Sequence, residues 1–214
     1  MKITDLGLLD YREAWLLQEA AHQRVCAGEE EEIFTVQHPP VITMGRREGS
    51  AANLRVSSEF LASNGVQLVQ SDRGGDITLH APGQLVVYPI VRLIDHKLSV
   101  GGYVHGLERA VIGALADLGL SGRADPKAPG VWVAGADGSD AKICAIGVRV
   151  RRGVTMHGLA LNINNDLSLF DLIVPCGLNG RSVTSIRQVM QIGQNFDAVS
   201  RTITTHLMGW LSGC

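Results

Sequence analysis

The segment Arg73-Gly-Gly-Asp-Ile-Thr-Leu-His-Ala-Pro-Gly-Gln84 is the most informative stretch of this sequence. It places one arginine, one histidine, three glycines and a proline within twelve residues, between apolar runs. Ordering such a segment costs conformational entropy, because glycine loses more backbone freedom on folding than any other residue. The pattern predicts either a loop whose backbone approaches a ligand, with polar contacts from Arg73 and His80, or a glycine hairpin turn leading into a buried strand.

Length and composition predict one globular domain. The chain has 214 residues, of which 45% are hydrophobic and 19% charged, so it can bury one large core. Nineteen basic and 21 acidic residues give a formal net charge of −2, which argues against general nucleic-acid binding. No apolar run is long enough to span a bilayer, and the first residues resemble neither a secretory signal nor an organelle import signal. We therefore expect a soluble, cytoplasmic protein that does not bind membranes.

The four cysteines are widely and irregularly spaced, at Cys26, Cys144, Cys176 and Cys214. This spacing fits neither a disulfide framework nor a paired zinc motif, so we expect free thiols. The sequence also contains no HExxH motif, no phosphate loop and no dinucleotide-binding glycine motif. We expect no bound metal and no cofactor.

Hydrophobic periodicity and turn residues predict an α+β domain whose sheet is mixed, mostly antiparallel and flanked by helices. The expected helices cover residues 11–27, 57–64, 104–118, 182–189 and 196–211. The expected strands cover residues 33–36, 66–70, 77–79, 85–91, 130–133, 141–150 and 154–163. Arg152-Gly153 is expected to form a hairpin turn between the last two strands. Pro89 predicts a bulge or an edge position for its strand.

Cys176 is the cysteine whose surroundings best suit a nucleophile. It lies in Val174-Pro-Cys-Gly177, where proline and glycine predict a sharp turn that leaves the thiol accessible. The alternative is a small buried hydrophobic residue, which is the commoner role of a free cysteine. Cys144 is a rival nucleophile, but burial within a strand would raise the pKa of its thiol and lower its reactivity.

Lys142 begins the otherwise apolar segment Lys142-Ile-Cys-Ala-Ile-Gly-Val148. It could be a solvated strand end, or its ammonium group could face a cleft, lower the pKa of a nearby cysteine and pass protons during acyl transfer. Because residues two apart on a strand point to the same side, we expect Lys142 and Cys144 to share a face of the sheet. His80 and His157 are either hydrogen-bonded core residues or ligand contacts, and a cysteine–histidine pair is also open.

Five motifs together resemble the lipoyl(octanoyl) transferases of protein lipoylation, in the order in which that family has them. They are residues 73–84, Ala128-Pro-Gly-Val-Trp-Val133, residues 142–148, His157-Gly-Leu-Ala-Leu-Asn162 and Phe170-Asp-Leu-Ile-Val-Pro-Cys-Gly177. The similarity covers nearly the whole chain. It implies a single acyltransferase domain over residues 1–214, with the catalytic fold of the biotin and lipoate protein ligases.

The resemblance implies that the protein moves an octanoyl or lipoyl group from acyl carrier protein to a lysine of a lipoyl domain. The implied acceptors are the lipoyl domains of 2-oxoacid dehydrogenase complexes and the glycine cleavage H protein. Cys176 is the implied acyl-thioester nucleophile and Lys142 its acid/base partner, in an enzyme expected to be a monomer. The implied substrate site consists of Arg73, Gly74, Gly75, Asp76, Ile77, Thr78, Leu79, His80, Ala145, Ile146, Gly147, Gly158, Leu159 and Ala160.

Two other functions remain open. An ATP-dependent lipoate or biotin ligase of the same fold would not need Cys176, but the sequence has no glycine- and arginine-rich nucleotide loop. A non-enzymatic module that binds acyl carriers or lipoyl domains would form no acyl adduct. Cys144 stands where the family pattern leads us to expect a small inert residue such as alanine. The acidic carrier protein could be contacted by residues that otherwise read as solvated surface: Arg46, Arg47, Arg149, Arg151 and Arg152.

Overall fold

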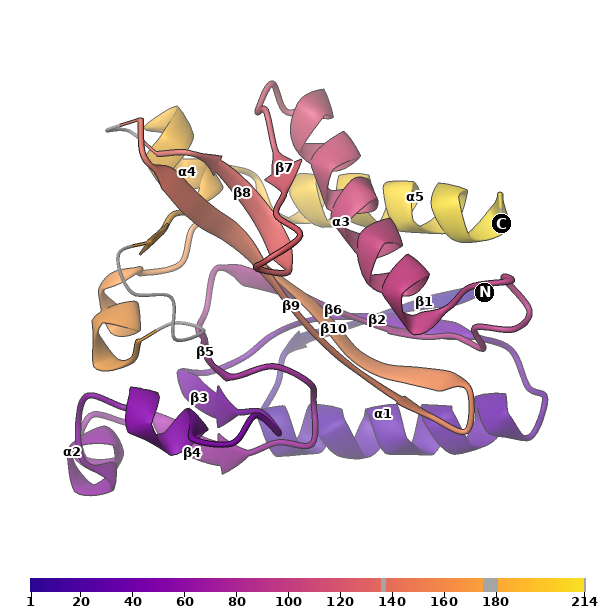
Figure 1. Ribbon diagram of the computed structural model, residues 1–214, viewed down its shortest axis with the longest axis horizontal. Helices are drawn as coiled ribbons and strands as arrows, with labels where there is room; N and C mark the ends of the chain where they lie inside the picture. Colours follow the sequence, from indigo (N-terminus) through magenta and orange to yellow (C-terminus); the bar gives the residue numbers. More distant parts are fainter. Residues whose placement is uncertain (136–137, 175–180, 214) are drawn as a thin grey trace.

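The computed structural model describes residues 1–135, 138–174 and 181–213. A large mixed sheet lies at the centre, in the strand order β1-β2-β6-β10-β9-β8-β7 (Figure 1). Its neighbouring strands run antiparallel except for β1 with β2, and the short β11 (Ser182–Val183) pairs parallel with β9. The strands of the main path are β1 (Lys2–Leu8), β2 (Glu32–Gln37), β6 (Gln84–Ile90), β10 (Val154–Asn162), β9 (Asp140–Arg151), β8 (Gly130–Ala134) and β7 (Arg123–Ala124).

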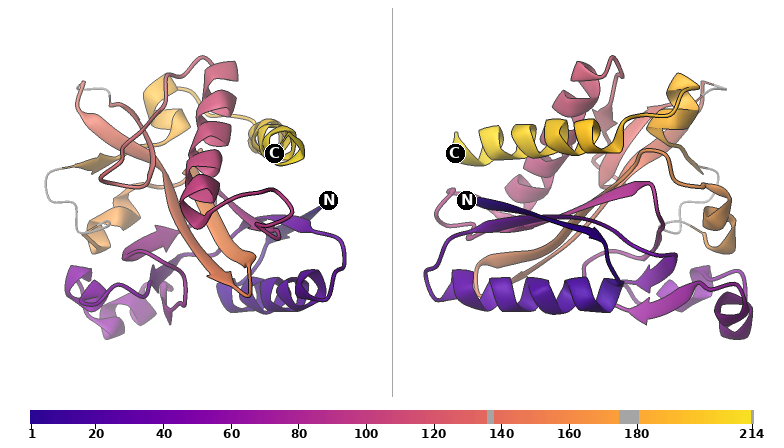
Figure 2. Two further views of the ribbon diagram at one scale, coloured as in Figure 1. Left: turned by 45° about the vertical axis from the view of Figure 1, so that its right-hand side comes forward. Right: turned by 180° about the vertical axis from the view of Figure 1, so that it is seen from behind.

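A smaller sheet lies beside the large one (Figures 1 and 2). In it, β3 (Val41–Met44) pairs parallel with β4 (Gln67–Gln70) and antiparallel with β5 (Ile77–His80). Since β5 belongs to the small sheet and β6 to the large one, residues 81–83 connect two sheets. The alternative of a hairpin turn within the glycine-rich segment is therefore wrong.

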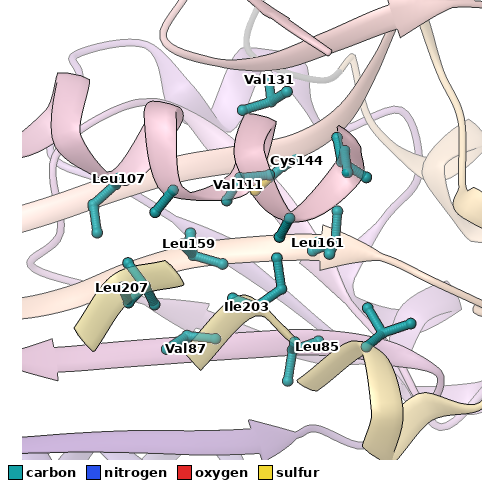
Figure 3. Close-up of a cluster of buried hydrophobic side chains, with 14 of the residues drawn as sticks. Leu85, Val87, Leu107, Val111, Val131, Cys144, Leu159, Leu161, Ile203 and Leu207 are labelled. Atoms are coloured by element: carbon teal, nitrogen blue, oxygen red, sulfur yellow. The ribbon is translucent and has the colours of Figure 1, made fainter. Parts of the chain in front are cut away.

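Helices cover both faces of the large sheet (Figure 2). α1 (Tyr11–Cys26) lies on one face, and α3 (Val100–Asp117) and α5 (Phe196–Ser212) lie on the other. In the larger core, Leu107 of α3 and Leu207 of α5 pack with strand residues such as Leu159 (Figure 3). Burial of this apolar surface, at about 25 cal/mol per Å², holds the helices on the sheet. No helix of the described ranges has both the length and the apolar composition that crossing a membrane requires.

The predicted α+β class with a mixed, mostly antiparallel sheet is confirmed. α3 begins four residues before the expected start because the Ser99 hydroxyl accepts a hydrogen bond from the N–H of Gly102 at 3.0 Å and caps the helix there. The helix expected at residues 182–189 is only partly correct, since β11 precedes the short α4 (Ile186–Met190), which is capped by Ser185. The remaining short elements are α2 (Ser58–Ser63) and the 3₁₀ turns η1 (Ser50–Asn53) and η2 (Ser168–Leu172).

Pro89 lies in a central strand, so the alternative of an edge position is wrong. The pairing of β6 with β10 stops where Val87 lies opposite Leu159, and it resumes only as an isolated bridge between Arg92 and Val154. Pro89 falls within this interruption, where its lack of an N–H group removes one ladder hydrogen bond. The proline therefore disturbs the ladder inside the sheet.

Candidate active site

Two pairs of small residues form a trough across the middle of the large sheet. Ala145 on β9 lies opposite Ala160 on β10, and Gly147 lies opposite Gly158. All four lie on one face of the sheet, because alternate residues of a strand share a face. Side chains this small leave room above the sheet for a flexible apolar group.

The glycine-rich loop closes one end of this trough. The N–H of Gly74 donates to the carbonyl oxygen of Val148 at 2.9 Å, so the loop crosses β9 next to Gly147. A Cβ at Gly74 would lie 2.9 Å from the Val148 oxygen, and one at Gly147 would lie 3.0 Å from the Gly74 oxygen. Glycine allows the two backbone segments to approach this closely.

A cleft that is partly open to solvent lies over the trough. The residues named from the sequence line this cleft, with the exception of Gly74 and Leu79. Gly74 instead bonds to β9, and Leu79 packs in the core of the small sheet. Three further lining residues were not indicated by the sequence, namely Tyr11, Val86 and Tyr88.

Stacked aromatic and histidine rings form the wall of the cleft nearest α1. Tyr11 stacks on His80 with 5.9 Å between ring centroids, and its hydroxyl lies 2.8 Å from the Ser71 hydroxyl. His80 Nδ1 lies 2.8 Å from the side-chain oxygen of Gln84. Burial, together with the neighbouring His38, lowers the pKa of His80 well below its usual value, so the ring is neutral at pH 7. This wall offers neutral polar groups to a ligand.

His157 reaches the cleft because its backbone departs from strand geometry. Its φ is 57°, and its N–H donates to the side-chain oxygen of Gln18 at 2.8 Å. The left-handed conformation turns the His157 ring to the side on which Met156 packs, the α1 side, where it contacts Trp15. Nε2 lies 2.6 Å from a carboxylate oxygen of Asp72.

The imidazole of His157 is neutral. Burial is the main cause, and the guanidinium groups of Arg73 and Arg149 add to it, lowering the pKa of His157 to about 3. The carboxylate of Asp72 is itself paired with Arg149. Since the Asp72 carboxylate can only accept, Nε2 carries the proton of the neutral ring.

Arg73 stabilises the glycine-rich loop through hydrogen bonds of its buried guanidinium. It is only 7% exposed, and its guanidinium donates to the carbonyl oxygen of Thr43 at 2.6 Å and to that of Gly74 at 3.0 Å. It therefore ties β3 to the segment that closes the trough. Contact between Arg73 and a substrate stays a prediction.

A β-bulge in β9 decides which way Lys142 points. Val131 of β8 lies opposite Cys144, but Trp132 lies opposite Lys142, so Ile143 is an extra residue on β9. Ile143 and Cys144 both pack in the α3–α5 core. The prediction that Lys142 and Cys144 share a face of the sheet is wrong, because the bulge resets the alternation.

Lys142 is buried at the end of the trough that lies away from Gly147. Only 7% of the residue is exposed, so the alternative of a solvated strand end is wrong. Its Nζ donates to the carbonyl oxygen of Pro129 at 3.1 Å and lies 4.8 Å from the centroid of the Trp132 ring. Lys142 lines a second, small cavity, which shares three residues with the cleft over the trough: Thr78, Ala145 and Ala160.

Cys144 is a poor nucleophile in this structure. It is fully buried, and desolvation raises the pKa of its thiol to about 12. The group is therefore a neutral thiol at physiological pH, as burial in a strand predicted.

Cys176 lies outside the described residues. On its N-terminal side, the N–H of Val174 donates to the carbonyl oxygen of Asn53 at 2.7 Å. On its C-terminal side, Arg181 lies 3.5 Å from the centroid of the Trp132 ring, and Val183 lines the same cavity as Lys142.

The surface arginines fall into two groups. Arg46 and Arg47 are exposed, and their N–H groups donate to the carbonyl oxygens of Arg73 and Gly75 in the glycine-rich loop. The second group lies at the end of β9 and in the hairpin turn that follows it: Arg149, Arg151 and Arg152. Within the described residues, no three histidine, cysteine or acidic side chains come together as ligands for a metal ion.

Comparison with known proteins gives a consistent result. Residues 10–208 match the family model of the lipoyl protein ligase A/B catalytic domain. An octanoyltransferase from Roseiflexus sp. (strain RS-1) is 47% identical over 209 residues, covering 97% of this chain and 85% of the relative. An octanoyltransferase from Chloroflexus aurantiacus is 49% identical over 191 residues, covering 88% of this chain and 83% of the relative.

Solved structures agree on the fold at much lower identity. Lipoate-protein ligase A bound with ATP has a TM-score of 0.81 at 17% identity, covering 99% of this chain and 85% of that one. The biotin protein ligase from Aquifex aeolicus has a TM-score of 0.55 at 9% identity, covering 100% of this chain and 70% of that one. With the family match and the curated relatives, the chain belongs to the octanoyltransferases of lipoate biosynthesis, a group of acyltransferases with the lipoyl protein ligase A/B catalytic domain.

Proposed function

We propose that this octanoyltransferase takes an octanoyl group from acyl carrier protein onto Cys176, as a thioester, and passes it to a specific lysine of a lipoyl domain. The observation that carries the proposal is the position of Lys142, whose ammonium group is buried at one end of a trough of alanine and glycine. An unbranched acyl chain fits such a trough, with its carbonyl group at the lysine end. This reaction would begin endogenous protein lipoylation in the cytoplasm.

The length of the trough suits eight carbons. Lys142 and Gly147 are five residues apart on β9, and the bulge removes one residue from the path, so they lie about 13 Å apart along the strand at about 3.3 Å per residue. An extended octanoyl chain is about 9 Å long, since each C–C bond of about 1.5 Å advances a zigzag chain by about 1.3 Å. The remainder accommodates the thioester group.

The proposed first step exchanges one thioester for another. The thiolate of Cys176 attacks the octanoyl carbonyl carbon, the bond from that carbon to the carrier's sulfur breaks, and protonated Lys142 gives its proton to the leaving thiolate. Bond energies on the two sides are nearly matched, so this step needs no ATP.

The proposed second step forms the amide. The amine of the acceptor lysine attacks the thioester carbon, the bond to the Cys176 sulfur breaks, and Lys142 takes the proton that the amine loses. Conversion of a thioester to an amide is downhill. Lys142 and Cys176 return to the ammonium and thiolate forms with which the first step began.

The proposed partners follow from this chemistry. Octanoyl acyl carrier protein is the donor, and the acceptors are the lipoyl domains of 2-oxoacid dehydrogenase complexes and the glycine cleavage H protein. Exposed Arg46 and Arg47, beside the loop that closes the trough, are suited to meet an acidic carrier. We propose that the enzyme acts as a monomer and without a cofactor.

Intact-protein mass spectrometry tests the nucleophile. After incubation with octanoyl carrier protein, wild-type protein should gain one octanoyl group, and Cys176→Ser should lose both this adduct and transfer to a lipoyl domain. Cys144→Ala is the matched control and should retain both, because the Cys144 thiol is buried and protonated. The opposite result would reassign the nucleophile.

The same incubation separates the alternatives. Transfer of free octanoate that requires ATP would identify a ligase, and binding without any adduct would identify a non-enzymatic module. Lys142→Ala should slow acylation most at neutral pH and recover in part at alkaline pH, where the Cys176 thiol ionises without help. An equal loss at every pH would mean that Lys142 only orients the substrate.

A further inference from the structure

Residues 128–132, which enter β8 and form its first half, hold the Lys142 side chain directly. The carbonyl oxygen of Pro129 accepts from Nζ at 3.1 Å. Trp132 lies opposite Lys142 in the pairing of β8 with β9, and its ring centroid is 4.8 Å from Nζ. Because a cation is attracted to the face of a tryptophan ring, both contacts favour one position of the ammonium group.

Glu108 of α3 binds the start of β8 from the other side. It is 2% exposed, and its Oε1 accepts from the N–H of Gly130 at 3.0 Å. Its Oε2 lies 2.9 Å from Nδ1 of His105. A buried carboxylate with this hydrogen bond fixes the backbone at the start of β8, because leaving either partner unsatisfied would cost free energy.

The carbonyl of Pro129 and the N–H of Gly130 belong to one peptide group. A trans peptide is planar, with its C=O and N–H pointing in opposite directions. The Glu108 carboxylate at the N–H edge therefore determines where the C=O edge points, and the C=O edge holds Lys142.

Gly130 allows this arrangement. Its φ is 127°, and a Cβ there would lie 2.5 Å from the carbonyl oxygen of Cys144 and 3.4 Å from Cε of Lys142. The start of β8 is thus packed against β9, with Glu108 on one side of it and Lys142 on the other.

We propose that Glu108 is a positioning residue for Lys142, which acts through the peptide group between Pro129 and Gly130. It orients the carbonyl that holds the ammonium group at the end of the trough. This inference rests on the proposed role of Lys142 in acyl transfer.

Three substitutions of Glu108 distinguish the effect of side-chain length from the effect of charge. Glu108→Gln keeps an acceptor oxygen at the same distance but removes the charge, whereas Glu108→Asp keeps the charge on a side chain one methylene shorter. Glu108→Leu removes both. We expect Glu108→Gln to keep kcat within about threefold, and Glu108→Asp and Glu108→Leu to lower kcat by about tenfold to a hundredfold with less than about threefold change in KM for octanoyl carrier protein.

Glu31 provides a matched control. It also accepts from a backbone N–H, that of Arg92 at 2.7 Å, and it also contacts a histidine, His96 at 2.9 Å, but it lines neither cavity at the trough. Glu31→Leu should lower the midpoint of thermal unfolding and leave kcat unchanged. If kcat follows thermal stability across both series, Glu108 is only structural and the proposal fails. Should Glu108→Leu not fold, the comparison of Gln with Asp decides.

The Lys142→Met background distinguishes this inference from the proposed function. If Lys142→Met is as active as the wild type, the role of Lys142 itself is wrong. If Lys142→Met is inactive while every Glu108 variant has wild-type kcat, only the positioning role is overturned. If Glu108→Asp is active and Glu108→Gln is inactive, the charge of residue 108 matters and the length of its side chain does not. This result also overturns the positioning role. In the supporting case, Glu108→Leu costs no further activity once Lys142 is methionine.

Discussion

Replacing Gly147 with alanine should shorten the acyl chain that the enzyme prefers. The added methyl group would enter the trough opposite Gly158, 3.0 Å from the Gly74 oxygen and 3.3 Å from Cδ of Arg73. It would thus occupy the end of the trough that lies about 13 Å from Lys142 along β9, where the last carbons of an octanoyl chain are expected. A hexanoyl chain ends before this point.

The magnitude follows from burial. Displacing one or two terminal carbons forfeits about 0.8 kcal/mol for each buried methylene, or about 0.8–1.6 kcal/mol. At about 1.4 kcal/mol for each factor of ten, kcat/KM for octanoyl donors should fall about 4- to 15-fold, while that for hexanoyl donors should stay within about twofold.

The assay is a competition between hexanoyl and octanoyl carrier proteins, with the acylated lipoyl domain measured by mass spectrometry. Gly209→Ala is the control for adding a methyl group to glycine, since a Cβ there meets no atom within 4 Å. It should leave the product ratio unchanged. An equal loss for both chain lengths in Gly147→Ala would refute the placement of the chain end at Gly147.

Three further predictions concern buried groups of the fold. Burial lowers the pKa of His38 to about 4 and that of His157 to about 3, so below pH 6.5 the unfolded chain binds more protons than the folded one. The free energy of unfolding, measured in urea, should therefore fall by up to about 2 kcal/mol per histidine between pH 7 and pH 5. A constant value over this range would contradict the prediction. Cys144, whose pKa is about 12, should react with iodoacetamide at pH 7 only after unfolding, as mapped by peptide mass spectrometry. In Gly106→Ala the new Cβ would lie 1.8 Å from Cζ2 of Trp210. Calorimetry should therefore show a free energy of unfolding lower by about 1–3 kcal/mol and a midpoint of thermal unfolding several degrees lower. An unchanged midpoint would mean that α5 moves to accommodate the methyl group.

Local sequence was sufficient where short-range interactions determine the structure. Arg152 and Gly153 both have positive φ, as a tight hairpin turn requires, and they join β9 to β10 as expected. Asp10 caps α1 through the N–H groups of Arg12 and Glu13, and the helix then covers almost the expected range. β1 and β3 were not predicted, because each is stabilised by pairing with a parallel strand that lies far along the chain.

The lining of the cleft was only partly visible in the sequence. Gly147 and Gly158 are conspicuous as glycines within apolar strands, and the chain does approach itself closely there. Tyr11 and Tyr88 carry no such signal, since they occupy apolar positions of a helix and a strand like any core residue. Their role in the wall depends on the packing of α1 against the sheet.

The sequence by itself determined the family, the α+β class and the small residues that make a trough. It could not determine which side chains face that trough. Alternation along a strand places Lys142 with Cys144, yet the extra residue in the pairing of β8 with β9 turns Lys142 to the opposite face. A left-handed backbone at His157, held by Gln18 of α1, likewise turns its ring to the α1 side. Both departures are stabilised by contacts between distant segments, and so only the tertiary structure decides them.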